Sequence, residues 1–159
     1  MFVKVSIIMS CYNSQATIGQ SVESILNQSY ENFELLICDD GSIDSTFREI
    51  EKYSKADKRI SIFKNEKNIG LTKSLNLLIN KSDGEFIARQ DDDDISLSHR
   101  IETQIKVIKD LNLDFATSRA KILGTVTKKL DYLVIGNSKP TKRKIQIAKE
   151  LKINLLTED

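Results

Sequence analysis

Short runs of apolar residues alternate along the chain with longer segments in which apolar residues recur every three or four positions. The first pattern is typical of strands buried on both faces, and the second is typical of amphipathic helices. The apolar runs predict four strands, at residues 3–10, 33–38, 60–63 and 85–88. The helical spacing predicts helices at residues 17–27, 44–53, 71–80 and 98–111. Strands that alternate with helices indicate an α/β fold with a mostly parallel sheet.

Polar loops follow three of the predicted strands directly, at Cys11–Ser14, Asp39–Ser42 and Asp91–Asp94. Because ligands of parallel sheets bind outside the carboxyl ends of the strands, we expect these loops to meet at one edge. The four consecutive aspartates repel one another, and a hard divalent ion such as Mg²⁺ or Mn²⁺ that bridges to phosphate oxygens would relieve this repulsion. The alternative is a solvated acidic turn that caps the next helix.

Composition excludes several classes of protein. The chain of 159 residues has room for one domain or one and a half. It contains neither a G-x-G-x-x-G loop nor a Walker A sequence, which argues against a dinucleotide-binding fold or a P-loop ATPase as its class. His99 is the single histidine, which excludes metal sites built from two histidines. No apolar stretch reaches the length of a membrane span, and no signal peptide is recognised. We therefore expect a cytoplasmic protein, or alternatively one that lies at the inner face of the membrane. In that compartment Cys11 and Cys38 would be reduced.

Charge divides the chain into two parts. Residues 1–117 carry 14 basic and 19 acidic residues, whereas residues 118–159 carry 10 basic and 4 acidic residues. This asymmetry predicts a domain at residues 1–117 followed by a basic αβ tail at residues 118–159.

The polar loops contain the residue types that a nucleotide site needs. Asp39 or Asp40 can accept a hydrogen bond from the N–H of a uracil-like base or from a ribose hydroxyl, and Tyr12 can stack on a base. Asp91 and Asp93 can hold ribose and a metal ion, which would make a diphosphate a better leaving group. The alternatives are a turn with a helix cap at Asp39–Ser42 and simple packing of Tyr12.

Five segments, in this order and spacing, resemble the opening of the family 2 glycosyltransferases: Val5–Asn13, Ser21–Tyr30, Phe33–Thr46, Asn65–Asn76 and Gly84–Asp94. The resemblance covers residues 3–117. It implies a Rossmann-like GT-A fold with helices on both faces of the sheet, truncated before the acceptor half. It also implies an inverting transferase that uses a nucleoside-diphosphate sugar, UDP-linked by preference, with Mg²⁺ or Mn²⁺. The acceptor would be a polysaccharide or a lipid-linked glycan of the cell envelope.

The same resemblance assigns roles to individual residues. Ser10 and Tyr12 would form the wall of the base pocket, and Asp39 and Asp40 would contact base and ribose. Lys73 lies in a segment that often approaches the donor. The Asp-x-Asp signature of the family matches Asp91, Asp92 and Asp93, with Asp93 as metal ligand, Asp91 as metal or ribose contact, and Asp92 and Asp94 in support.

Two features leave alternatives open. No acidic motif after Asp114 matches the general base of the family, so the rival reading is a non-catalytic module that binds a nucleotide-sugar or a protein. Residues 118–159 resemble the later part of a BRCT domain, as found in bacterial NAD-dependent DNA ligases. The alternative is an αβ extension that completes the GT-A sheet, and the basic face could also touch nucleic acid or anionic lipid.

Overall fold

The structure, a computed structural model, describes residues 3–118 and forms the α/β fold that the sequence predicts. In this part of the chain, four strands alternate with four helices. In chain order they are β1 (Val5–Cys11), α1 (Ile18–Leu26), β2 (Phe33–Asp39), α2 (Thr46–Ala56), β3 (Ile60–Lys64), α3 (Leu71–Ile79), β4 (Phe86–Arg89) and α4 (Arg100–Leu111). From residue 119 onward the predicted tail lies outside the described residues, so its resemblance to a BRCT domain stays a prediction. The boundary between the two parts near residue 117 also stays a prediction.

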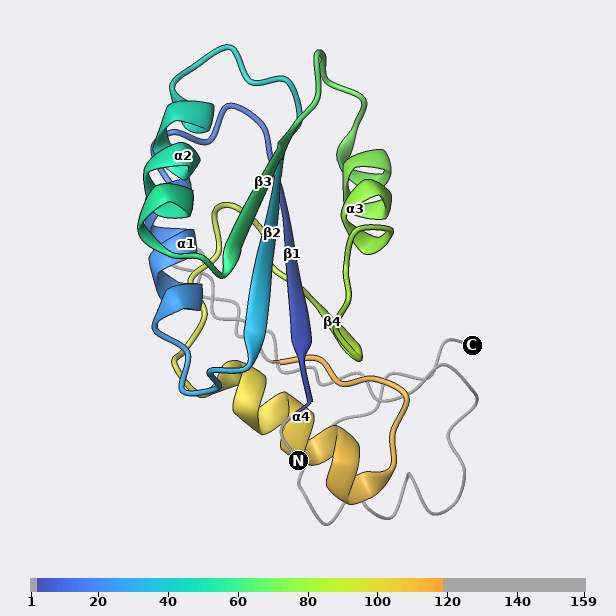
Figure 1. Cartoon of the computed structure of the whole chain (residues 1–159). Coiled ribbons are helices and arrows are strands. Elements are labelled where there is room, and N and C mark those ends of the chain that lie inside the picture. The colour runs from blue at the N-terminus through green and yellow to red at the C-terminus, as the bar shows by residue number, and fades with distance from the viewer. Residues whose placement is uncertain (1–2, 119–159) are drawn as a thin grey trace, which may run out of the picture. The chain divides into compact units, whose positions relative to one another are not determined.

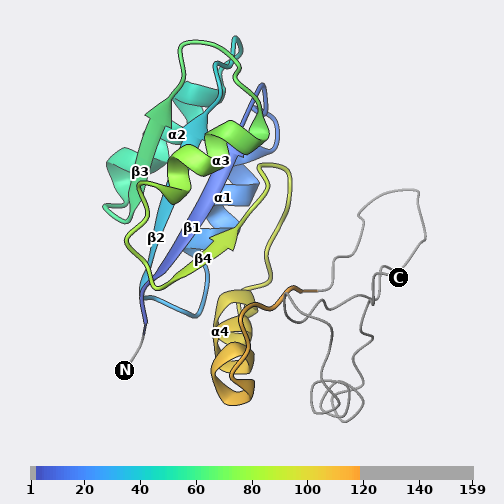
Figure 2. The same cartoon turned by 90° about the vertical axis from the view of Figure 1, so that its right-hand side faces the viewer.

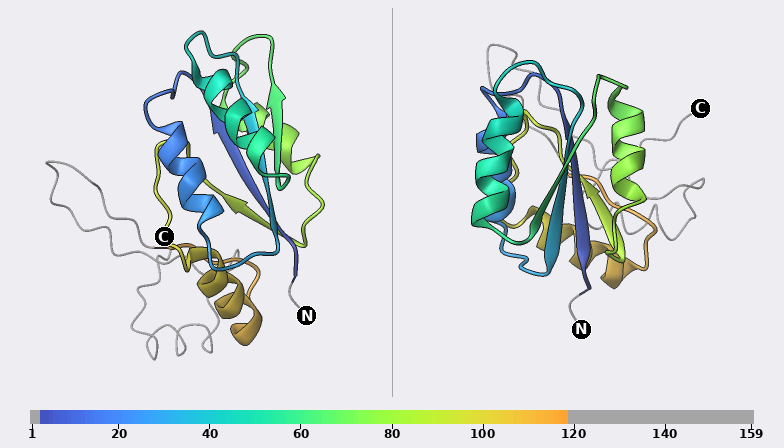
Figure 3. Two further views of the ribbon diagram at one scale, coloured as in Figure 1. Left: turned by 60° about the vertical axis from the view of Figure 1, so that its left-hand side comes forward. Right: turned by 45° about the horizontal axis from the view of Figure 1, so that its top comes forward.

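All four strands pair in parallel, in the order β3-β2-β1-β4. Helices α1 and α2 cover one face of the sheet and α3 covers the other (Figure 1). The right-hand view of Figure 3, with the top of Figure 1 tilted forward, shows the same three layers. Figure 2 shows α3 lying across the strands on its own face. The predicted fold class is therefore confirmed, with helices on both faces.

The two central strands explain why their sequences are apolar without alternation. All seven residues of β1 are buried, as are six of the seven in β2. Ile8, Leu36 and Leu78 form part of the core between the sheet and α3. Because neighbouring residues of a strand point to opposite faces, Ile7 and Leu35 face α1 and α2, and both are fully buried.

Strand β2 extends one residue beyond its apolar run and includes Asp39, which we predicted to lie in a turn. The neighbouring strands supply the reason, because Asp39 is paired with Cys11 of β1 and Lys64 of β3. The ladder continues past it: the Asp40 N–H donates to the Cys11 carbonyl at 2.8 Å, and the Asn65 N–H donates to the Asp39 carbonyl at 2.9 Å. Main-chain pairing on both sides thus fixes this carboxylate at the end of the sheet.

The chain divides into two units, residues 1–101 and 102–159. In the described part of the second unit, α4 ends in a Schellman motif in which Asn112 takes a left-handed conformation (φ 50°) and the Leu113 N–H donates to the Ile108 carbonyl at 2.9 Å. No helix within residues 3–118 has the length and apolar character required to cross a membrane.

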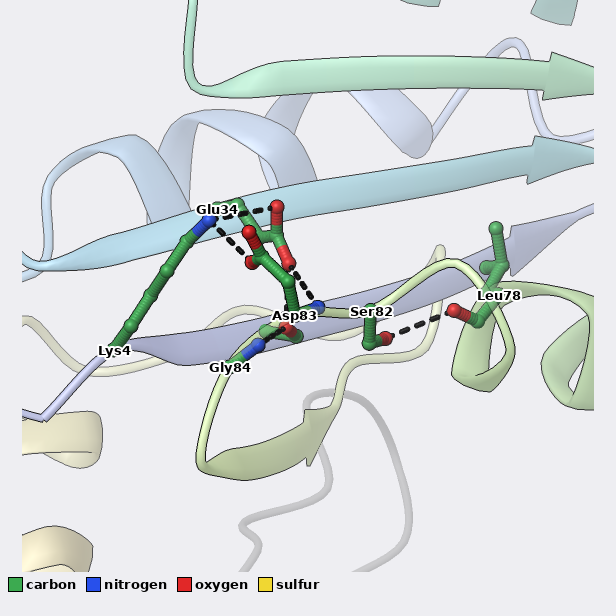
Figure 4. A network of polar contacts seen from close by, with 7 residues as sticks. Lys4, Glu34, Leu78, Ser82, Asp83 and Gly84 are labelled. Atoms are coloured by element: carbon green, nitrogen blue, oxygen red, sulfur yellow. Dashed lines mark hydrogen bonds and ion pairs between the residues drawn. The ribbon is translucent and has the colours of Figure 1, made fainter.

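A charged network joins the amino-terminal ends of the strands (Figure 4). Lys4 pairs with Glu34 and with Asp83. The Ser6 hydroxyl donates to Glu34 at 2.5 Å and accepts from the Gly84 N–H at 2.9 Å. This close approach leaves no space for a side chain at Gly84, because an added Cβ would lie 2.5 Å from the backbone nitrogen of Ser6.

Replacing Gly84 with alanine should therefore lower the free energy of unfolding by about 2–3 kcal/mol, the usual cost of forcing atoms into a packed interior. Urea denaturation would measure the loss. The matched control is Gly19→Ala in α1, where the Cβ would meet only the Tyr53 hydroxyl at 3.2 Å. Since alanine favours the helix, we expect that control to be neutral or more stable by up to about 1 kcal/mol. Equal losses in the two variants would contradict the steric explanation.

Candidate functional site

The loops after β1, β2 and β4 meet at the carboxyl edge of the sheet, as their spacing predicts. Strands β2 and β3 lie on one side of β1, and β4 lies on its other side. The point between β1 and β4 is therefore a topological switch point, which is where ligands bind in open α/β sheets. A pocket of about 270 Å³ opens at this edge. It is lined by four predicted site residues and three others: Ser10, Tyr12, Asp40 and Asp92, together with Cys11, Asn68 and Leu71.

The Tyr12 side chain is 46% exposed, so its ring is available to a ligand. The next residue, Asn13, has a positive φ of 53°, which asparagine tolerates better than most residues. Its side-chain oxygen accepts from the Ile43 N–H at 2.9 Å, and its own N–H donates to the Ser42 hydroxyl at 3.0 Å. These two bonds join the loop that carries Tyr12 to the turn after β2.

Three further bonds continue this connection, which we call the loop zipper (residues 13–15 with residues 42–46). The Ser14 N–H donates to the Thr46 hydroxyl at 2.8 Å, and the Gln15 N–H donates to Asp44 at 3.2 Å. The Ser45 N–H donates to the Gln15 side chain at 2.9 Å. Asp44, one residue before the N-cap Ser45, also accepts from the Thr46 N–H at 2.9 Å and so satisfies the first N–H group of α2.

Asp39 has an unsatisfied carboxylate oxygen. One oxygen accepts from the Ser42 N–H at 3.1 Å, whereas Oδ2 is buried with no hydrogen-bond partner. The residue has no exposed surface. A buried carboxylate oxygen without a donor is costly, and in a site region it indicates a ligand that supplies the donor. Asp39 does not itself line the pocket, but its partner across the sheet, Cys11, does.

Asp40 is satisfied from within the chain. Its Oδ1 accepts from the Asn65 amide at 2.8 Å and from the Ile69 N–H at 2.9 Å, and its Oδ2 accepts from the Gly70 N–H at 2.8 Å. Burial alone would raise the pKa of Asp40, but these hydrogen bonds outweigh it and hold the pKa below its ordinary value. Asp40 therefore fastens the loop between β3 and α3 to the pocket.

Asn68 and Leu71 line the pocket although we did not predict them as site residues. They lie in and just after the polar loop at residues 65–70, which follows β3 at the same edge of the sheet. The rule that selected the other three loops would have selected this one. Lys73, a predicted donor contact, is exposed on the first turn of α3 and does not line the pocket.

The acidic turn at residues 91–94 lies after β4. Asp92 lines the pocket, and Asp93 and Asp94 are exposed. Asp91 forms a two-pronged ion pair with Arg89, in which the guanidinium nitrogens donate at 2.9 and 3.0 Å. Among residues 3–118, no three Asp, Glu, His or Cys side chains are gathered as a complete metal site. Mg²⁺ commonly takes one or two carboxylates plus substrate phosphates, and this turn can supply the carboxylates.

Comparison with known proteins adds an independent finding. The family described as glycosyl transferase family 2 matches residues 6–156. The putative glycosyltransferase EpsE of Bacillus subtilis is 44% identical over 107 residues, which are 67% of this chain and 38% of that protein. UDP-Glc:alpha-D-GlcNAc-diphosphoundecaprenol beta-1,3-glucosyltransferase WfgD of Escherichia coli is 39% identical over 119 residues, 75% of this chain and 46% of that protein. The chain thus spans less than half the length of these relatives.

A solved structure shares the fold. TarS of S. aureus, crystallised in complex with UDP, superimposes with a TM-score of 0.65 at 28% sequence identity. The match covers 70% of this chain and 33% of that one.

Proposed function

Since the chain belongs to glycosyl transferase family 2, we propose that its pocket binds the nucleoside diphosphate of a UDP-linked sugar, with a divalent cation, for transfer to a glycan or lipid-linked acceptor. The resemblance seen in the sequence is confirmed at the level of the family and the fold. The nucleotide, the metal and the acceptor are our proposals. They are supported by the similarity to TarS, solved with UDP, and to WfgD, named for UDP-Glc and a diphosphoundecaprenol-linked sugar.

The observation that carries the proposal is the unpartnered Oδ2 of Asp39. Uracil presents one N–H on its pairing edge, between two carbonyl groups, and this N–H would satisfy a buried carboxylate oxygen. The ring of Tyr12 would stack on the base, and Ser10 would close the wall of the pocket. Because Asp39 is fully buried, the wall beside Cys11 has to open slightly for the base to reach it.

The acidic turn would hold the metal. We assign Asp93 as the principal ligand and Asp91 as a second ligand or a ribose contact, with Asp92 facing the pocket. Mg²⁺ or Mn²⁺ bound here would neutralise the diphosphate and improve it as a leaving group. Asp40 is already bonded to three donors, so we assign it to holding the 65–70 loop, with contact to ribose as a secondary role.

Transfer with inversion is part of the proposal. The acceptor hydroxyl would attack the anomeric carbon, its proton would pass to a general base, and the bond to the diphosphate would break. The described residues bind and orient the donor in this scheme. Release of free sugar from UDP-sugar, or transfer to an acceptor, would separate an enzyme from the rival possibility, a module that binds the donor without chemistry.

Titration calorimetry with UDP, GDP and CDP, each with and without Mn²⁺, tests the proposal. We expect UDP to bind more tightly than the other two, and Mn²⁺ to tighten UDP binding at least about 10-fold, equivalent to 1.4 kcal/mol. The metal should matter because two phosphates and four carboxylates otherwise repel one another. If no nucleotide binds in the presence of Mn²⁺, the proposal is wrong.

A further inference from the structure

Gln90, directly before the acidic turn, is a buried amide with hydrogen bonds on both sides. It is 4% exposed. Its Nε2 donates to the Asp94 carbonyl at 2.8 Å, to the Asp91 carbonyl at 3.2 Å and to the Ser21 hydroxyl at 3.2 Å. Its Oε1 accepts from the Ser96 hydroxyl at 2.7 Å and from the Arg100 guanidinium at 3.2 Å. The side chain therefore contacts both ends of the acidic turn from within the protein.

The surrounding donors and acceptors fix which way this amide points. Nε2 faces two backbone carbonyls, which cannot donate, and Oε1 faces a guanidinium, which cannot accept. A flipped amide would set oxygen against oxygen on one side and N–H against N–H on the other. Glutamate would place a negative oxygen against the two carbonyls. Of these isosteric side chains, only glutamine satisfies the position.

The contacts also link the turn to helix α1. The Ser21 hydroxyl, which accepts from Gln90, itself donates to the Asp91 carbonyl at 2.8 Å. Ser21 is 1% exposed and belongs to α1. Helix, glutamine and turn thus form a closed ring of hydrogen bonds. The carbonyls held by this ring belong to the first and last of the four aspartates.

We propose that Gln90 is a positioning residue for the metal site, which holds the main chain of Asp91–Asp94 so that these carboxylates can share a cation with a bound diphosphate. The inference rests on the proposed function. Positioning matters here because the carboxylates lie on a short turn, and small displacements of ligands weaken metal binding sharply. Gln90 itself does not touch the pocket, so its effect passes through the backbone of the turn.

The chain offers a matched control in Gln28, a second buried glutamine, which connects α1 to the segment that follows the acidic turn. Gln28 is 6% exposed, and its Nε2 donates to the Ser24 carbonyl at 3.0 Å and to the Leu97 carbonyl at 2.8 Å. Its Oε1 accepts from the Ile101 N–H at 3.0 Å. It therefore anchors residues 97–101, beyond the acidic turn, with the same chemistry.

The test compares Gln90→Leu with Gln28→Leu by titrating UDP with and without Mn²⁺, alongside thermal denaturation. Both variants should melt at lower temperature. We expect Gln90→Leu to lose at least about 10-fold of the Mn²⁺-supported UDP affinity, while its metal-free affinity changes less than about 2-fold. Gln28→Leu should retain the wild-type gain from Mn²⁺. Ser21→Ala, which removes two bonds of the ring with little loss of volume, should show an intermediate loss and serves if Gln90→Leu does not fold.

The outcomes separate the two proposals. If wild type shows no gain from Mn²⁺, the proposed function fails and the positioning role falls with it. If wild type shows the gain and both Gln90→Leu and Ser21→Ala retain it, only the positioning role is overturned. Equal losses in Gln90→Leu and Gln28→Leu would show a general effect of destabilisation, which also overturns it.

Discussion

Substitution of Asp39 by asparagine should reduce UDP affinity by about 100-fold, within the range expected when a charge-assisted hydrogen bond is lost and a donor faces a donor. The carboxylate accepts from the Ser42 N–H with one oxygen, and its Oδ2 has no partner and is the atom to which we propose that the base donates. An asparagine has a single oxygen. In either orientation its NH₂ group would therefore point at an N–H, either that of Ser42 or that of the base. Calorimetric titration with UDP would measure the loss.

The neighbouring residue provides the control for this prediction. Asp40→Asn should lower the free energy of unfolding by about 1–3 kcal/mol, because its NH₂ group would face the donors from Asn65, Ile69 and Gly70. Since the pKa of Asp40 is lowered from 3.8 by folding, its stabilising effect is present above about pH 4 and declines as the pH falls further. The difference between wild type and Asp40→Asn should shrink accordingly. A large loss of stability in Asp39→Asn with unchanged UDP binding would reverse the roles that we assign.

Replacing Asp93 with alanine should remove most of the gain in UDP affinity that Mn²⁺ provides, at least about 10-fold. Asp93 is exposed, so its loss should change the free energy of unfolding by less than about 0.5 kcal/mol. Asp91 is paired with Arg89 in the structure and would have to leave that pair to bind metal, which is why we expect the larger effect at Asp93. Titrations of UDP with and without Mn²⁺ would measure it.

Asp94→Ala is the matched control, because it removes one negative charge from the same turn. If the turn attracted the metal only through its total charge, the two variants would lose the same affinity. We expect Asp94→Ala to lose no more than about 3-fold, as a supporting residue would. Unaltered Mn²⁺-dependent binding in Asp93→Ala would show that this ligand is wrongly assigned.

The sequence predicts the strands, the helices and the edge where the loops meet, because each depends on local pattern. Strands β1 and β2 are buried on both faces and their apolar runs are uninterrupted, so the pattern is unambiguous. Asp39 and Asp40, by contrast, are adjacent and chemically identical. What distinguishes them is the loop at residues 65–70, whose Ile69 and Gly70 N–H groups donate to the carboxylate of Asp40, whereas the Asn65 N–H donates only to the main-chain carbonyl of Asp39. That difference depends on tertiary structure and has no local signal.

Gln90 shows the same limit in another form. In the sequence it is one polar residue between an apolar strand and a run of aspartates, and nothing distinguishes it from a surface residue. Its burial arises because α1 supplies Ser21 and the chain returns with Ser96 and Arg100. Contacts from three directions, separated by up to 69 residues in sequence, create the environment that only the folded chain reveals.

The loop zipper constrains how substitutions could change the nucleotide base that we propose this site prefers. Its five bonds connect side chains of one loop to main-chain N–H groups of the other, so they depend on the register between the loops. Ile43, which is 88% exposed, takes part through its main-chain N–H and not through its side chain. An insertion in either loop would shift every bond that follows it. Residues 13–15 and 42–46 are therefore best exchanged together, as one unit, in any redesign of the base preference that we propose for this pocket.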